Sequence, residues 1–366
     1  MYKIFTIVGT RPEIIKLSSF IKNADKFFNQ VLIHTGQNFD YELNEIFFKD
    51  LSIRKPDFFL DCAQENTNKT ISKIILKIDE ILISQKPDAV IILGDTNSGL
   101  AAIAAKKRNI PIFHVEAGNR SFDSKVPEEL NRKLIDHCSD INFTYTNLSK
   151  NYLLQEGFYP DRIINIGSPM LEVINNQKKK IVQSKILKQL KIKKNDYFLI
   201  SFHREENVDY IENLENFFEL VKWLNVKYKK KIVISTHYRT KKKILENKRK
   251  MNFNNNIMFL KPFSFSDYIK LQMNSFIVLS DSGTLTEEAS ILQIKSIMLR
   301  NSHERPEGME EATTIMCGLD KNKIQLAIKM LESGMEHNLV KNYKNSNFST
   351  KLMKNILSYL NYNLRS

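Results

Sequence analysis

The 366-residue chain lacks the features that mark disulfide-rich, metal-binding and membrane proteins. Its three cysteines, Cys62, Cys138 and Cys317, are widely spaced and form no C-x-x-C pair, which argues against a disulfide framework and a zinc site. No apolar run approaches the roughly 20 residues that a membrane helix needs. The apolar part of the N-terminus is too short for a signal peptide. We therefore expect a cytoplasmic protein with no membrane partner.

Basic residues outnumber acidic ones, and the net charge of +14 is of the kind found in nucleic-acid-binding proteins. The lysines are scattered, however, and their short clusters at 178–180, 229–231 and 241–243 fall where helix ends and turns are expected. Aromatic residues do not alternate with them as they would along a groove for single strands. We expect a solvated basic surface, with some steering of dianionic substrates and no nucleic-acid partner.

A strand, a turn and a helix are predicted in sequence around residue 280. The apolar run 276–279 predicts a buried strand of a parallel sheet, and the small polar residues SDSGT suit a tight turn into a helix at 285–292. A helix that begins there presents free N–H groups and the positive end of its dipole. The amides of Ser282, Gly283 and Thr284 would then face a phosphate.

Two arginines follow the next predicted strand. Arg300 and Arg305 come just after residues 296–299, so at least one guanidinium could reach the same anion. The alternative is a scaffold without a ligand, because Ser and Thr are ordinary N-caps and acids in a first helical turn are ordinary dipole partners. Taken alone, this strand–turn–helix pattern slightly favours the scaffold.

The N-terminal strand, predicted at 3–8, leads into the turn GTRPE. Pro12 suits the start of a helix. Arg11 and Lys16 would then lie near the helix start, where an anion is favoured. A capped turn with no ligand is the alternative.

Three carboxylates come just past predicted strand ends or in an adjoining loop: Asp95, Glu116 and Glu128. Carboxylates gathered at one sheet edge repel one another unless one is protonated, which raises a pKa and allows proton transfer near neutral pH. Abstraction and return of a carbon-bound proton would need such a set. The alternatives are an N-cap role for Asp95 and salt bridges with Arg120 and Arg132.

Alternating strands and helices continue beyond a hinge at GSP, residues 167–169. This pattern predicts two doubly wound, Rossmann-like α/β domains, at 1–168 and 169–350, followed by a terminal helix in 351–366. His203 stands at the end of the predicted strand 197–202, where an imidazole could contact phosphate or transfer a proton. A histidine in such a place is more often structural.

Several motifs, in order along nearly the whole chain, resemble the non-hydrolysing UDP-N-acetylglucosamine 2-epimerase family. They are TIVGTRPEIIKLS, HVEAGNR, VPEELNR, HREEN, SDSG, TEEAS and ERPEG. The resemblance implies the two-domain glycosyltransferase-B fold with the active site in the cleft between the domains, and a terminal helix that returns to the first domain. It also implies a homodimer.

The resemblance further implies a role for each matching residue. Arg11, His203, Arg305 and the turn at Ser282, Gly283 and Thr284 would hold the diphosphate, Lys16 would line the site, and Glu288 would hold the ribose. Tyr268 would stack on uracil, with core packing as its alternative. Thr284 is a departure, because the common family pattern has a glycine there, which affects how closely the backbone can approach a phosphate.

The implied reaction inverts carbon 2 of a UDP-linked 2-acetamido sugar. UDP is eliminated to leave a 2-acetamidoglycal and is then added back while the proton returns to the other face. Asp95, Glu116 and Glu128, with His203, would be the catalytic residues. Neither a metal nor another cofactor is expected, and the sequence has no G-x-G-x-x-G pattern.

One branch of the family is a closer match. HTGQNFDYELNEIFF, EAGNRSFDSKVPEELNRKLIDHCSDINFTYT, IGSPM and HERPEGMEEA resemble enzymes that convert UDP-2-acetamido-2,6-dideoxy-L-talose to UDP-N-acetyl-L-fucosamine for capsule and O-antigen, a lipopolysaccharide component. The loop 119–126 is shorter than is usual in enzymes that interconvert UDP-GlcNAc and UDP-ManNAc. Those enzymes remain the alternative. A glycosyltransferase of the same fold is a second one, although it would not need the acids of HVEAG and PEE.

Overall fold

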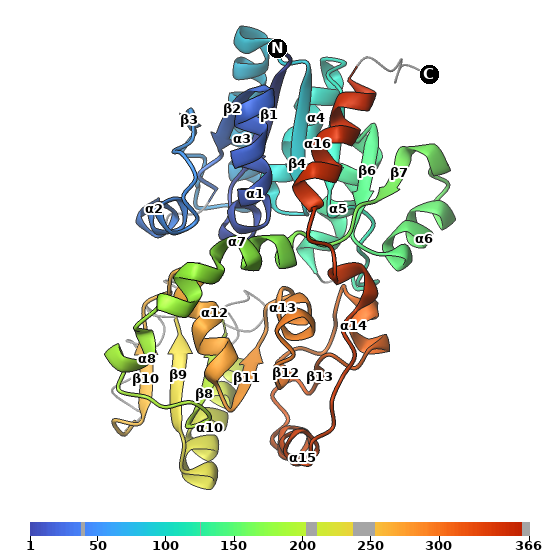
Figure 1. Cartoon of the computed structure of the whole chain (residues 1–366). Coiled ribbons are helices and arrows are strands. Elements are labelled where there is room, and N and C mark those ends of the chain that lie inside the picture. The colour runs from blue at the N-terminus through green and yellow to red at the C-terminus, as the bar shows by residue number, and fades with distance from the viewer. Residues whose placement is uncertain (38–40, 125, 203–210, 237–252, 361–366) are drawn as a thin grey trace. The chain divides into compact units, whose positions relative to one another are not determined.

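The computed structural model describes residues 1–37, 41–124, 126–202, 211–236 and 253–360 (Figure 1). It forms two compact units, one of Met1–Asn176 with Lys341–Ser366 and one of Gln177–Val340. Helix α7 (Met170–Gln183) runs across the first boundary between them. No helix in the described ranges is long and apolar enough to cross a membrane.

The first unit is built on a seven-stranded sheet of order β3-β2-β1-β4-β5-β6-β7. Its strands are β1 (Lys3–Val8), β2 (Asn29–His34), β3 (Phe58–Phe59), β4 (Ala89–Leu93), β5 (Ile112–Val115), β6 (Ile141–Thr144) and β7 (Ile163–Asn165). All pairings are parallel. The strand order reverses between β1 and β4, and in such sheets ligands bind at the carboxyl ends of the strands beside this point.

Helices connect the strands of the first unit. They are α1 (Arg11–Phe27), α2 (Tyr41–Asp50), α3 (Thr67–Gln85), α4 (Ala101–Lys107), α5 (Pro127–Cys138) and α6 (Asn147–Gln155), with short 3-10 turns η1 (Asn97–Leu100), η2 (Pro160–Arg162) and η3 (Lys341–Tyr343). Helix α3 shows why they form, because its buried residues Thr70, Ile74, Ile78 and Ile81 recur at helical spacing and face the core beneath the sheet.

The C-terminal helix α16 (Phe348–Tyr359) belongs to the first unit, where it lies beside α1 (Figure 1). The amide of Asn23 on α1 donates to the Ser349 hydroxyl at 3.1 Å. Phe348 meets the ring of Tyr145 edge-on, with 6.1 Å between centroids. The first unit is therefore completed by the end of the chain.

The second unit holds a six-stranded parallel sheet of order β10-β9-β8-β11-β12-β13. Its strands are β8 (Tyr197–Ser201), β9 (Lys231–Ser235), β10 (Ile257–Leu260), β11 (Ile277–Ser280), β12 (Ser296–Met298) and β13 (Ile315–Met316). Its helices are α8 (Ile186–Gln189), α10 (Ile211–Tyr228), α12 (Phe265–Asn274), α13 (Leu285–Leu292), α14 (Pro306–Glu310) and α15 (Lys321–Glu332).

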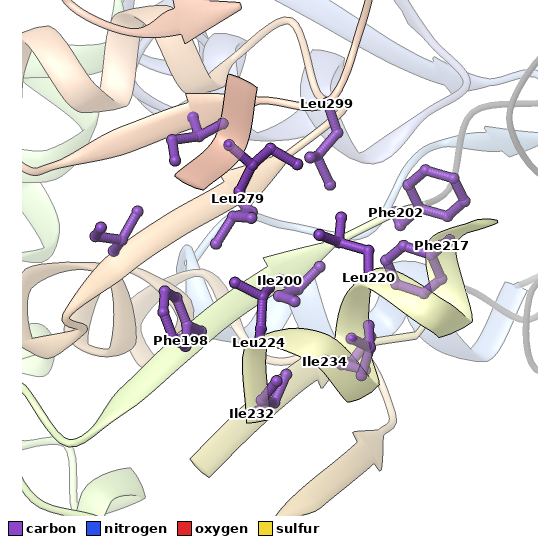
Figure 2. Packing of buried hydrophobic residues seen from close by; sticks show 14 of the residues in the cluster. Phe198, Ile200, Phe202, Phe217, Leu220, Leu224, Ile232, Ile234, Leu279 and Leu299 are labelled. Atoms are coloured by element: carbon purple, nitrogen blue, oxygen red, sulfur yellow. The ribbon is translucent and has the colours of Figure 1, made fainter. Parts of the chain in front are cut away.

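Strand β8 is buried on both faces. Phe198 and Ile200 enter a cluster with α10, shown in Figure 2, whereas Tyr197 and Leu199 enter a second cluster on the opposite face. Successive side chains alternate between the faces of a strand, so a strand covered on both sides is continuously apolar. The predicted fold class, two doubly wound Rossmann-like α/β domains, is confirmed.

Candidate active site

Two predicted site residues, Asp95 and Glu116, lie at neighbouring strand ends in the first unit. Asp95 follows β4 after one residue and Glu116 follows β5 directly, and the two strands pair in parallel with Leu93 opposite Val115. The structure thus places these two acids together at the carboxyl edge of the sheet, as predicted.

Asp95 is held by the helix that follows the next strand. Arg132 donates to Oδ2 of Asp95 from Nε at 3.0 Å and from Nη2 at 2.6 Å. Asn131 donates to the Asp95 carbonyl at 3.0 Å. The salt-bridge alternative is therefore realised at Asp95 itself, whose side chain is 29% exposed. The N-cap alternative is wrong, because the side chain that caps η1 is that of Thr96.

Glu116 forms an ion pair with Lys16 from helix α1, at 2.5 Å. The ammonium of Lys16 also lies 5.7 Å from the centre of the Tyr145 ring. Glu116 has a left-handed backbone, with φ of +67°, which costs a residue other than glycine about 1–2 kcal/mol. Such strain persists where surrounding contacts hold it, and it is common at functional sites. The structure thus brings Lys16 and Glu116 together.

Glu128 lies in the first turn of α5, half-buried. Its neighbour Glu129 fixes this turn, accepting from the Ser121 amide and hydroxyl at 2.9 Å each and from Arg132 at 3.0 Å. Burial opposes ionisation of Glu129, yet the Ser121 hydrogen bonds and the charge of Arg132 leave its pKa below the usual range. Glu128 is therefore carried by a helix start that is tied both to Asp95 and to the loop 119–126.

A second layer beneath these residues was not predicted. Buried His114 bonds from Nδ1 to Asp136 and from Nε2 to the Gly94 carbonyl, both at 2.8 Å. Asp136 also accepts from Arg120 at 2.8 Å. Burial opposes ionisation of Asp136, but His114 and Arg120 hold its pKa below the usual range. The Gly94 carbonyl can only accept, so Nε2 of His114 donates to it, and Asp136 lies at the other ring nitrogen.

This layer also corrects the predicted salt bridges. Arg120 pairs with Asp136 and Glu156, and Arg132 pairs with Glu129 as well as with Asp95. The signal that could have indicated the layer is His114 itself, a polar residue at the end of the otherwise apolar run 111–114. Its carboxylate partner, on a helix, had no comparable signal.

In the second unit, the turn SDSGT joins β11 to α13 as predicted. The Ser282 amide donates to the Ser280 hydroxyl at 3.0 Å, and the Thr284 amide donates to the Ser282 hydroxyl at 3.4 Å. Within the described part of the chain, the Gly283 amide has no such bond. At the predicted anion site, the amides of Ser282 and Thr284 therefore donate to adjacent hydroxyls, and the amide of Gly283 makes no hydrogen bond with the described residues.

Arg305 lies against this turn, at the start of α14. Its Nε donates to the Gly283 carbonyl at 3.1 Å, and its Nη2 pairs with fully buried Glu287 at 3.1 Å. Arg300 instead pairs with Glu304 at 2.8 Å. Of the two predicted arginines, Arg305 is the one that the fold attaches to the turn.

Glu288 and Tyr268 come from the adjacent helices α13 and α12. The Glu288 carboxylate accepts from Gln272 Nε2 at 2.6 Å, in a buried setting. Gln272 was not predicted, and it orients the carboxylate. Tyr268 is half-buried against the apolar cluster that includes Leu271, so its core-packing alternative is at least partly realised.

The remaining predictions concern His203, metals and cysteines. His203 lies outside the described residues, and its role stays a prediction. In the ranges that the structure describes, no group of three or more His, Cys, Asp or Glu side chains is placed to hold a metal ion. Cys62, Cys138 and Cys317 are free thiols.

Comparison with known proteins identifies the family. Residues 22–360 match the family model described as UDP-N-acetylglucosamine 2-epimerase. The chain belongs to the non-hydrolysing UDP-N-acetylglucosamine 2-epimerase family. The enzyme is therefore an isomerase, as the motifs of its sequence predicted.

Similar proteins cover nearly all of the enzyme. A solved UDP-N-acetylglucosamine 2-epimerase from Rickettsia bellii is 46% identical, with 100% of this chain and 99% of that chain covered and a TM-score of 0.92. The Methanocaldococcus jannaschii enzyme, solved with UDP-GlcNAc and UDP, is 34% identical, with 98% and 99% covered and a TM-score of 0.91. A UDP-N-acetylglucosamine 2-epimerase of Methanococcus maripaludis is 39% identical over 92% of this chain and 94% of its own. These likenesses confirm the predicted glycosyltransferase-B type of fold.

Proposed function

We propose that the enzyme inverts carbon 2 of a UDP-linked 2-acetamido sugar by eliminating UDP and adding it back. The observation that carries the proposal is the pair of carboxylates at adjacent strand ends, Asp95 bound to Arg132 and Glu116 bound to Lys16. A cation beside each acid fixes its orientation and compensates its charge at a partly buried edge.

The reaction balances without an oxidant or a second substrate. A carboxylate removes the proton from carbon 2, the bond from carbon 1 to the phosphate oxygen breaks, and UDP leaves with the electron pair. The product is a 2-acetamidoglycal with a double bond between carbons 1 and 2. The UDP oxygen then attacks carbon 1 while carbon 2 receives a proton on its opposite face. Asp95, Glu116 and Glu128 are the proposed proton-transfer residues. His203, the fourth proposed catalytic residue, would hold the diphosphate of the leaving group.

Stabilising the leaving group is the proposed task of the phosphate residues. Backbone amides at the start of α13 and its dipole favour an anion, and the cation of Arg305 lies against the same turn. The proposed UDP ligands are Arg11, Lys16, Tyr268, Ser282, Gly283, Thr284, Glu288 and Arg305. Gln272 supports the proposed contact of Glu288 with the ribose, since it holds one carboxylate oxygen.

For the sugar, we propose UDP-2-acetamido-2,6-dideoxy-L-talose, converted to UDP-N-acetyl-L-fucosamine for capsule or O-antigen synthesis. The branch motifs and the short loop 119–126 support this choice. The loop joins Glu116 to Glu128 in sequence and is tied down by Arg120 and Ser121, so its length bears on the space beside both acids. UDP-GlcNAc is the second candidate, supported by the names of the similar proteins and by the ligand of the Methanocaldococcus jannaschii structure. A cytoplasmic homodimer is part of the same proposal.

Incubation of the purified enzyme with each UDP-sugar in deuterated water tests the reaction and the sugar together. We expect deuterium at carbon 2 and inversion there, with the L-talose derivative turned over fastest, and no need for an acceptor. A glycosyltransferase would show neither effect with the donor alone. Asp95→Asn provides the background rate. If carbon 2 of every UDP-2-acetamido sugar kept its hydrogen, the proposed reaction would be wrong. If only UDP-GlcNAc exchanged its carbon-2 hydrogen, the proposed reaction would stand and only the proposed sugar would be wrong.

A further inference from the structure

Glu13, in the first turn of α1, has a carboxylate whose bonds extend beyond its own helix. It is 2% exposed. Its Oε2 accepts from the amides of Gly9 at 2.5 Å and Thr10 at 2.8 Å. Its Oε1 accepts from the Thr96 hydroxyl at 2.5 Å. Both oxygens of one buried side chain are therefore engaged, by donors from two different turns.

These two turns lie where the strand order of the first sheet reverses. Gly9 and Thr10 follow β1 and lead directly into Arg11, whereas Thr96 follows Asp95 at the end of β4. The two strands pair in parallel. The turns are also packed closely, since a Cβ added to Gly9 would lie only 1.9 Å from the Ser98 hydroxyl of the β4 turn. A shift of one turn therefore displaces the other.

Capping of α1 does not account for this arrangement. An acid in a first turn commonly accepts from the N-cap amide and interacts with the helix dipole, and it does so at the surface. Burial raises the pKa of Glu13 to about 7, against the lowering effect of the hydrogen bonds from Thr96, Gly9 and Thr10. An apolar or exposed residue at position 13 would avoid the cost of burying a carboxylate. The bond to Thr96 contributes nothing to the N-cap of α1.

We propose that Glu13 is a positioning residue for the reaction, which holds the turn of Arg11 and the turn of Asp95 in one fixed arrangement. It does not itself contact the sugar. The inference rests on the proposed function for the role of Asp95. A catalytic group displaced by about 1 Å can lose about a hundredfold in rate, so the bond between Glu13 and Thr96 acts on turnover through Asp95.

Three variants test the inference in the carbon-2 exchange assay, with UDP affinity measured by calorimetry. Thr96→Val removes the bond between the turns and the long cap bond of η1, from the Ser98 amide at 3.3 Å, and leaves the N-cap of α1. We expect kcat to fall about tenfold with an unchanged UDP dissociation constant. Glu13→Ala removes all three bonds, and kcat should fall between about tenfold and a hundredfold. Glu13→Gln should recover most of the rate, because its amide accepts from Gly9 and Thr10 and donates to Thr96.

Gln30→Ala is the matched control. Gln30 is buried in the same unit, accepts from the Thr6 hydroxyl at 2.8 Å and donates to the Ile21 carbonyl at 2.9 Å, so its loss lowers stability without touching either turn. Its kcat should stay within about twofold of the wild type. The double variant Glu13→Ala with Thr96→Val should lose less than the product of the two single losses, because both changes break the bond between Glu13 and Thr96.

The two proposals fail in different ways. A wild-type enzyme that exchanges no carbon-2 hydrogen would overturn the proposed function. A wild-type enzyme that does exchange it, with Glu13→Ala and Thr96→Val as fast as Gln30→Ala, would overturn the positioning role alone, as would fully additive losses in the double variant. Should Glu13→Ala not fold, Thr96→Val still decides, since it leaves the N-cap of α1 intact.

Discussion

Arg132 directs two N–H groups at a single oxygen of Asp95, Oδ2, at 3.0 and 2.6 Å. A third N–H, on Nη1, donates to Glu129 at 3.0 Å. The planar guanidinium therefore fixes the carboxylate of Asp95 and the start of α5 relative to each other, and Oδ1 of Asp95 has no hydrogen bond from the described residues. An oxygen of that kind suits proton abstraction, while the other keeps the group oriented.

Arg132→Lys should therefore slow turnover by about tenfold or more while UDP affinity is retained. A single ammonium group cannot bond to Asp95 and Glu129 with the geometry of the planar guanidinium. The exchange of the carbon-2 hydrogen measures the turnover rate, and calorimetry measures the affinity for UDP. Arg108→Lys is the control, since Arg108 forms a two-bond pair with Asp79 on an exposed surface of the same unit. Equal rates in both lysine variants would contradict the orienting role of Arg132.

The proton-transfer and phosphate residues should separate in a second experiment. Asp95→Asn and Glu116→Gln are expected to keep UDP affinity and lose at least about a hundredfold in kcat, because the amides cannot accept the proton. Arg305→Ala should lose both turnover and UDP affinity, since a charge-assisted phosphate contact is lost. An equal collapse of affinity in all three variants would refute this division of roles.

Arg305→Ala also breaks the ion pair with buried Glu287, so unfolding has to be separated from lost affinity. Glu287→Gln is the matched control, because it removes the ion pair and keeps the guanidinium. We expect it to bind UDP within about threefold of the wild type. The double variant Glu287→Gln with Arg305→Ala, which removes both charges of the ion pair, should still bind UDP poorly.

The stability of the enzyme should depend on pH through Glu13. Its folded pKa of about 7 lies above the ordinary value of 4.5. The contribution of Glu13 to the free energy of unfolding is thus fully present below pH 4.5. It is lost as the pH rises to 7, because the unfolded chain releases the proton at a lower pH than the folded one. The loss is about 3 kcal/mol, from about 1.4 kcal/mol for each pH unit between the two values.

Urea unfolding of the wild type and Glu13→Gln between pH 4.5 and 8 provides the measurement. The difference in unfolding free energy, wild type minus variant, should decline up to pH 7 and then level off. Other groups cancel in this difference, among them His34, whose burial lowers its pKa to about 4 and which acts in the opposite direction. A difference that is flat or rises with pH would show that Glu13 ionises normally.

The buried layer under the site should matter for stability. Asp136→Ala leaves Arg120 and His114 without their common carboxylate, and removal of one partner of a buried pair costs about 3–5 kcal/mol. Urea unfolding at pH 7 measures the loss. Asp79→Ala, which breaks the exposed pair with Arg108, is the control and should change stability little. Comparable losses in both variants would mean that the buried layer contributes no more than a surface pair.

Local sequence was sufficient for the elements and for several turns. Apolar β-branched runs such as 89–93 form strands because a strand covered on both faces must be apolar throughout, and SDSGT makes the turn that its small polar residues suit. The ordered motifs indicated the family, and the positions of Asp95 and Glu116 just past strand ends indicated a common sheet edge. Each of these inferences concerns residues close together in the chain.

The partners of those residues were decided by the tertiary structure. Lys16 reaches Glu116, Arg132 reaches Asp95, and Glu13 reaches Thr96 because β1, β4 and β5 are adjacent in the sheet, an order that no single segment encodes. Tertiary packing also explains one error, since Arg120 pairs with Asp136 of α5 and not with a predicted site acid. The other error is local, because Thr96, next to Asp95 in the sequence, provides the side chain that caps η1. A sequence states which charges exist, and the order of the strands determines which of them meet.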